Sequence, residues 1–217
     1  WVNTNNNSYV AYVFAGGEST ESEAVSVDFD GNDHLNITSS SSSNMSPATG
    51  DFCIEAWLKP SEWGTNDGHY IVDTGGPSFE VVGSSYTFKK NGGSTLLSAS
   101  LPEIGQWTHV AVTRSGTSLK MFYNGTEVSS ATDSTDFSAT GNTYIAFGYD
   151  HYRGKISNLR FVKGTAVYTS SFKPPTEPLT NITNTVLLCC NNSSTAGSTV
   201  TPGTINNNGD PTASTDS

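Results

Sequence analysis

The sequence is poor in basic residues: ten Lys and Arg stand against twenty Asp and Glu, for a net charge of −10. A nucleic-acid-binding surface needs clustered cations to neutralise phosphates, so this balance excludes nucleic acid as the expected partner. It equally disfavours attraction to an anionic membrane surface. No apolar run approaches the roughly 18 residues of a membrane span, and no secretory signal pattern opens the chain, so no membrane insertion is predicted.

Cysteine is also scarce. The three cysteines are Cys53, Cys189 and Cys190, an odd number that does not form a disulfide framework. A bridge from Cys53 to Cys189 or to Cys190 stays open, but buried free thiols are the favoured interpretation. There is no CxxC, and the four histidines are scattered, so no zinc site is predicted.

The residues that are abundant, namely Ser, Thr, Asn and Gly, favour short strands joined by turns. Residues 51–60 give the clearest strand, with Phe52, Ile54, Ala56 and Leu58 on one face. Further strands are expected, at spacings of about 8–12 residues, over 24–29, 34–38, 69–73, 79–82, 86–90, 95–99, 107–114, 118–123, 143–148, 154–162 and 184–190. Segments 24–38 and 107–123 both have the pattern of hairpins. The chain is therefore predicted to be all-β, an antiparallel two-sheet β-sandwich.

Composition divides the chain into three parts. Residues 1–23 are predicted to hold an N-terminal strand (Ser8–Ala15) and a polar linker, and 24–190 to form the domain. Within the domain, 163–178 should wrap the surface as extended chain, because it is rich in Thr and Pro. Residues 191–217, rich in Ser, Thr and Asn, are expected to be a flexible tail. The start at Trp1 without Met suggests a piece of a longer polypeptide.

Five segments in order resemble the laminin-G-like members of the concanavalin A superfamily. They are VDFDGNDHL (27–35), FCIEAWLKP (52–60), GQWTHVAVT (105–113), LKMFYNG (119–125) and GKISNLR (154–160). The match covers about 24–163, and the strand at 184–190 is expected to belong to the same fold. This resemblance implies a concanavalin A-like jelly roll.

Three other segments resemble structural proteins of marine bacteriophages: YVAYVFA (9–15), FVKGTAVYTSSFKPPTEP (161–178) and TVLLCC (185–190). This narrower resemblance implies a protein of the virion surface, such as a capsid decoration or a tail appendage or fibre module. Its partners would be other virion proteins, and it would assemble as a homo-oligomer or symmetric array.

No enzymatic site is predicted. Glucanases of this fold place acid and nucleophile on one strand as E-x-D-x-x-E, and the sequence has no such run and no G-x-S-x-G. Glu55 stands alone in the strongest strand and is expected to make a structural hydrogen bond near a sheet edge. His109, Arg114 and Arg160 are likewise interpreted as structural residues.

Calcium is the most reasonable metal, since the resemblance implies oxygen donors for a hard cation. The candidates are Asp28, Asp30, Asn32 and Asp33, with Asp67 and Asp73 in other loops. The DGND segment is equally what a simple turn requires, and the turn is the favoured interpretation.

Two loops combine aromatic platforms with planar polar side chains, as glycan binding requires. The first is 62–69 and the second 149–153; their candidate residues are Trp63, Asn66, Asp67, His69, Tyr149, His151, Tyr152 and Arg153. Trp57 and Trp107 fit the strand pattern and are predicted to be core. The alternative interpretation of these loops is packing against another subunit or a neighbouring protein. The leading expectation is thus a non-enzymatic virion-associated interaction domain, and the alternative is lectin-like recognition of a host surface glycan.

Overall fold

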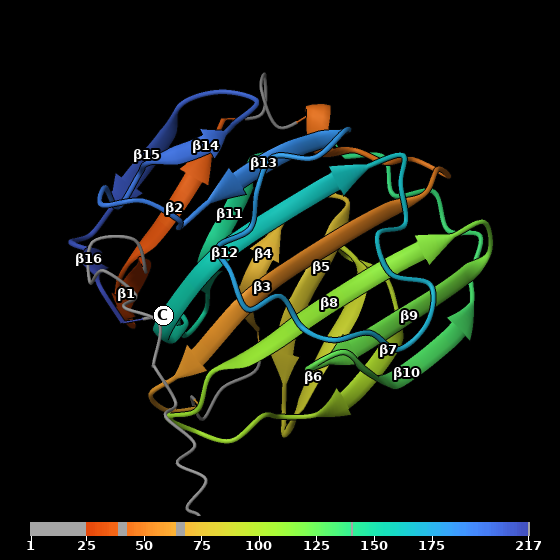
Figure 1. Ribbon diagram of the computed structural model, residues 1–217, viewed down its shortest axis with the longest axis horizontal. Helices are drawn as coiled ribbons and strands as arrows, with labels where there is room; N and C mark the ends of the chain where they lie inside the picture. The colour runs from red at the N-terminus through yellow and green to blue at the C-terminus, as the bar shows by residue number, and fades with distance from the viewer. Residues whose placement is uncertain (1–24, 39–42, 64–67, 140, 217) are drawn as a thin grey trace, which may run out of the picture.

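A computed structural model describes residues 25–38, 43–63, 68–139 and 141–216. The strand expected at 8–15 and the linker up to residue 23 lie outside the described residues. Two antiparallel sheets pack face to face (Figure 1), and the described part contains one 3₁₀ turn, η1 (Ser43–Met45), and no α-helix. The prediction of an antiparallel two-sheet β-sandwich is confirmed. No helix in this part of the chain is long and apolar enough to span a membrane.

The first sheet, which we call sheet A, has β3 near its centre. Its order is β10 (Thr126–Thr132), β9 (Ser118–Tyr123), β8 (Thr108–Ser115), β3 (Phe52–Pro60), β12 (Arg153–Lys163), β1 (Ser26–Asp30) and β16 (Thr212–Ser214), with β13 (Thr185–Cys189) and β14 (Ser198–Val200) joined through β12. The first half of β12 pairs with β1 and its second half with β13. The predicted hairpin of 107–123 is confirmed, since β8 pairs with β9.

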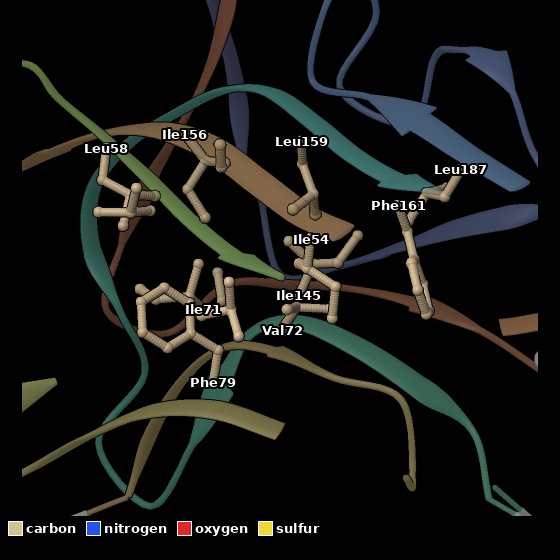
Figure 2. Close-up of a cluster of buried hydrophobic side chains, with 14 of the residues drawn as sticks. Ile54, Leu58, Ile71, Val72, Phe79, Ile145, Ile156, Leu159, Phe161 and Leu187 are labelled. Carbon is tan, nitrogen blue, oxygen red and sulfur yellow. The ribbon is translucent and has the colours of Figure 1, made fainter. Parts of the chain in front are cut away.

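The second sheet, sheet B, lies behind sheet A in Figure 1. Its order is β15 (Ile205–Asn208), β2 (His34–Ile37), β11 (Thr143–Gly148), β4 (His69–Asp73), β5 (Pro77–Val82), β6 (Ser85–Lys90) and β7 (Thr95–Ser100). The core fills the space between the sheets. In Figure 2, Ile54 and Leu58 of sheet A point toward Ile71 and Phe79 of sheet B. Each such side chain contributes about 1.5–3 kcal/mol on full burial.

The hairpin predicted for 24–38 is wrong, because its two strands belong to different sheets. Strand β1 pairs with β12 and β16, whereas β2 pairs with β11 and β15. The DGND turn therefore carries the chain from one sheet to the other. The buried Asp33 holds this crossing: its carboxylate accepts N–H groups of Asp30 (3.1 Å) and of Asp210 (2.8 Å).

The flexible tail predicted for 191–217 is also wrong for its described part, which supplies β14, β15 and β16. Strand β15 lies along β2 in sheet B, and β16 lies along β1 in sheet A. Backbone donors and acceptors can complete a sheet edge whatever their side chains are, so few apolar anchors were needed. Ile205 is buried at this edge. The domain consequently extends to residue 216. Strand β10 was not among the predicted strands either; its side chains are mostly exposed, so it lacks an apolar pattern.

Asp216 fastens the end of this segment to sheet A. Its Oδ2 accepts the Nζ groups of Lys59 (2.8 Å) and Lys155 (3.3 Å), and its Oδ1 accepts the indole N–H of Trp107 (3.1 Å). The hydrogen bond from Lys59 is the largest cause that lowers the pKa of Asp216 to about 2.

This pKa predicts how acid affects the segment. A carboxyl with a depressed folded pKa stabilises the fold above its ordinary value of 3.8, and that contribution is lost as pH falls toward 2. We expect the Trp107 indole N–H resonance to shift between pH 4 and pH 2 as the clamp on Asp216 opens. In Asp216→Asn, which has no such carboxyl, the resonance should not titrate in this window; identical titrations of both proteins would contradict the prediction.

Residues 164–184 run over the outer face of sheet A without regular structure, which agrees with the surface wrap expected at 163–178. In Figure 1 the segment crosses in front of β8 and β9. Phe172 donates its N–H to Gly125 O (2.9 Å), and its ring stacks on Tyr168 at 3.6 Å. We call 164–184 the wrap.

All three cysteines are free and buried, so the favoured interpretation is confirmed and the bridge from Cys53 is not formed. The sulfur atoms of Cys189 and Cys190 lie 3.9 Å apart. Burial raises the pKa of the Cys53 thiol. The thiols therefore act as small apolar groups of the interior.

Candidate functional site

Glu55 is the centre of a buried cluster of ionisable side chains in sheet A. Glu55 Oε1 accepts Nη2 and Nε of Arg160 (2.6 and 2.9 Å), and Oε2 contacts His109 Nε2 (3.1 Å) and accepts the Tyr168 hydroxyl (2.8 Å). Burial alone would raise the pKa of Glu55, but the His109 hydrogen bond and the Arg160 charge hold it below its ordinary value. Glu55 lies in central β3, not near an edge as expected, and its contacts under the wrap are structural.

Sheet B presents a different surface on the side away from the core. Its strand pairing aligns polar and aromatic residues in rows across the sheet; they are Asn206, Asn208, His34, Asn36, Tyr144, Phe147, Tyr70, Asp73, Ser78, Glu80, Thr87 and Lys89. We call this set the outer face of sheet B. Its aromatic members are only partly buried. The rings are thus accessible in part, whereas Asp73, Ser78, Glu80 and Thr87 in the same rows are buried.

Four rings form the centre of this face, and we call His34, Tyr144, Phe147 and His151 the aromatic patch. Tyr144 and Phe147 stack with centroids 4.5 Å apart, and Phe147 lies 4.8 Å from His34 and 5.2 Å from His151. Burial is the first cause that lowers the pKa of both histidines, which keeps them neutral near pH 7. The patch is therefore an uncharged aromatic surface.

Backbone geometry explains why Tyr144 and Phe147 meet. Residues three apart on a regular strand point to opposite faces. Ala146 has φ 61° and is buried together with Ile145, so two consecutive residues face the core. Phe147 therefore emerges beside Tyr144. Regular strand alternation would place residues 144 and 147 on opposite faces, so the sequence pattern does not predict this pair.

Polar groups surround the patch in defined orientations. The Asn206 amide donates to Asn36 Oδ1 (3.2 Å), and the Asn142 amide donates to the Tyr144 hydroxyl (3.1 Å). On the neighbouring strand, burial first and the charge of Glu80 second raise the pKa of Tyr70 to about 12. Tyr70 is accordingly a neutral hydroxyl at physiological pH.

The predicted loop 149–153 divides between surface and interior. Tyr149 is 97% exposed, and His151 joins the aromatic patch. Tyr152 is 1% exposed and donates its hydroxyl to Lys155 O (3.2 Å), so its prediction as a surface platform is wrong. It lies just before β12 with its ring in the core. Arg153 forms ion pairs with Glu62 and, at 3.6 Å, with Asp150.

The predicted loop 62–69 does not offer Trp63 as a free platform. The Trp63 ring packs edge-on against Tyr86 at 5.2 Å, and its N–H donates to Pro102 O (3.2 Å). His69 is buried, while Asn66 and Asp67 lie outside the described residues. The ion pair of Glu62 with Arg153 nevertheless joins the two predicted loops.

One acidic group in the described part has metal-like spacing: the carboxylates of Asp30, Asp33 and Asp210 lie within 4.8 Å of one another. Asp210 was not predicted, and Asp28 instead lies 3.7 Å from Lys155 Nζ. Burial raises the pKa of Asp33, whose two oxygens already accept backbone N–H groups. Calcium takes about six to eight oxygens. These contacts match the turn interpretation, and calcium binding stays a prediction.

The other predicted calcium donors lie apart from this group. Asp73 accepts Gly75 N (2.8 Å) and the Asn91 amide (2.6 Å) at the far end of β4, and Asp67 is not described. Asn32 donates to Asp30, which closes the turn further. Among the described candidates, Asp73 and Asn32 therefore do not converge on one additional site.

Comparison with known proteins identifies the family and related folds. A laminin-G-type family model, described as the concanavalin A-like lectin/glucanases superfamily, matches residues 29–171. No curated protein sequence matches. A Bacteroides ovatus protein thought to bind carbohydrate superposes with TM-score 0.61 and 15% identity over 90% of this chain and 60% of its own. A heptameric SAP-like pentraxin of Limulus polyphemus gives TM-score 0.51 and 20% identity over 69% and 79%. These likenesses show the fold.

Proposed function

Because the chain belongs to the concanavalin A-like lectin/glucanase superfamily, we propose that it is a non-enzymatic carbohydrate-binding domain whose site is the outer face of sheet B. The stacked Tyr144–Phe147 pair carries the proposal. Sugar rings pack their C–H faces on aromatic rings, while hydroxyls bond to planar polar groups beside them. Asn36 lies opposite Tyr144 on one side and Asp73 on the other.

The charge of this face selects the class of sugar. Asp73 and Glu80 bring negative charge, and Lys89 lies 2.5 Å from Glu80 Oε1 and compensates it. An anionic glycan would be repelled by the remaining carboxylate. The ligand we propose is therefore a neutral oligosaccharide.

The state of the described carboxylates supports binding without cleavage. Hydrolysis requires two carboxyl groups free to act as acid and as base or nucleophile. Asp73 accepts Gly75 N and the Asn91 amide, and Glu80 is paired with Lys89. Glu55 is enclosed in sheet A. These engagements support a binding role.

We expect Tyr144→Ala to weaken binding of a neutral oligosaccharide at least tenfold, about 1.4 kcal/mol, because the stacking surface is lost. A neutral-glycan array would identify the ligand, and calorimetry would give the affinities. Ile104→Ala, which removes a partly exposed side chain elsewhere, serves as the control and should bind like the parent.

Tyr149→Ala separates the face from the exposed loop that the sequence favoured. If Tyr149→Ala abolishes binding and Tyr144→Ala does not, the loop is the site and the proposal for the face fails. A parent protein that binds no glycan on the array would overturn carbohydrate binding altogether.

A second proposal concerns location. We propose that the domain is borne on the surface of a phage particle, where it contacts other virion proteins in a symmetric array. The support is the resemblance carried by 9–15, 161–178 and 185–190. Mass spectrometry of purified particles tests it: the chain should be present in assembled virions, and its absence from them would end this proposal.

A further inference from the structure

The outer face of sheet A is not uniform. Beyond the wrap, near the end of β3, two tryptophans and two lysines lie together: Trp57, Lys59, Lys155 and Trp107. Lys59 and Lys155 are opposite each other in the β3–β12 pair, and Lys59 Nζ lies 5.8 Å from the centre of the Trp107 ring. Both tryptophans are half-buried here, so their prediction as core residues is wrong.

The Asp216 carboxylate already accepts hydrogen bonds from Lys59, Lys155 and Trp107. Asp216 receives two ammonium groups on one oxygen and the Trp107 indole N–H on the other, as described above. Ser26 adds a hydrogen bond to the Asp216 backbone oxygen. Charge and an oriented N–H together define a receptor for a planar anion.

The resident carboxylate is exposed to solvent and can therefore be reached by a competing anion. Asp216 follows β16, a strand of three residues with mainly exposed side chains. The side chains of Asp216, Lys59 and Lys155 retain 40%, 29% and 24% of their exposure. Exposed ion pairs contribute little to stability, and a short edge strand with few buried side chains opens locally at low cost.

We propose that Lys59, Lys155 and Trp107 form a binding site for the carboxylate of an acidic sugar, a uronic acid, and that Asp216 occupies this site in competition. The lysines pair with the carboxylate, and the indole N–H fixes its orientation. The rings of Trp57 and Trp107 offer apolar surface to the sugar C–H groups. The site is separate from the outer face of sheet B, whose charge suits a neutral sugar.

The test uses glucuronate as probe and glucose as its neutral counterpart. Asp216→Asn removes the carboxylate that pairs with both lysines and leaves only Asp28, 3.7 Å from Lys155 Nζ. It should therefore bind glucuronate at least tenfold more tightly than the parent, and glucose should not bind at this site. Calorimetry and tryptophan fluorescence give the affinities. Adding Lys59→Met to Asp216→Asn should abolish the gain in glucuronate affinity. Adding Lys120→Met should not, because Lys120 of β9 is paired with Glu127 of β10.

Two results would overturn the inference: equal responses to glucuronate and glucose in Asp216→Asn, or a gain that survives Lys59→Met. If Asp216→Asn does not fold, the parent is titrated with glucuronate while the Trp107 indole resonance is followed; a shift supports the site and no shift refutes it. Tyr144→Ala separates the two proposals, because it should leave glucuronate binding unchanged.

Discussion

Replacing Glu55 with alanine is expected to lower the free energy of unfolding by about 3–5 kcal/mol, because it strands a buried cation. Arg160 is 5% exposed, and its guanidinium makes two of its hydrogen bonds to Glu55. The Tyr168 hydroxyl and the His109 ring would lose the same acceptor. Since Tyr168 belongs to the wrap, the variant should also loosen that segment from sheet A.

Urea denaturation followed by tryptophan fluorescence measures this loss. Glu127→Ala is the matched control: it also removes a glutamate paired with a cation, but the Lys120–Glu127 pair is exposed, so a much smaller loss of stability is expected. The double variant Glu55→Leu with Arg160→Leu should cost less than Glu55→Ala, because no buried charge is left alone. Equal midpoints for Glu55→Ala and Glu127→Ala would contradict the argument.

Arg114→Leu is expected to cost a similar 3–5 kcal/mol, for a different combination of reasons. Arg114 is fully buried and donates to Ala48 O (2.7 Å), Gly50 O (2.6 Å) and Thr135 O (2.6 Å). Leucine would leave these carbonyl oxygens without their donor. It would also leave the buried Asp133, 3.6 Å away, without its cation.

The Arg114 side chain further lies over the rings of Phe52 and Phe137, at 5.3 and 4.9 Å. Arg114→Lys should not restore stability, because a single ammonium cannot reach three carbonyls as the planar guanidinium does. The control is Arg153→Leu, which removes an exposed arginine and should lower stability far less than Arg114→Leu. If Arg114→Leu unfolded at the same urea concentration as the parent protein, the stabilising role of Arg114 would be refuted.

Local pattern was sufficient for most of the strands. Alternation in 51–60 placed Phe52, Ile54 and Leu58 in the core, where the structure has them. The turn between 114 and 118 correctly joined β8 to β9, since both strands stay in one sheet. The wrap followed from its Pro and Thr content, and the odd cysteine count already favoured free thiols.

The composition of a turn does not determine which sheet the following strand joins. The DGND segment satisfies any reversal, and only the packing of β1 beside β12 and β2 beside β11 sends its two strands into opposite sheets. The strands of residues 191–216 likewise could not be predicted from local sequence. Asn206 pairs with Asn36, 170 residues earlier in the chain, so its strand character comes from an edge that distant residues provide.

The sequence by itself determined the all-β class, most strands and the absence of the glucanase carboxylate pattern, because each depends on neighbouring residues with a period of two. The two proposed binding surfaces were decided only by tertiary structure. Tyr144 meets Phe147 because Ala146 adopts a positive φ, and Lys59 meets Trp107 and Asp216 because separate strands end side by side. Such side-chain contacts depend on pairing between strands that are distant in sequence, which local periodicity does not encode.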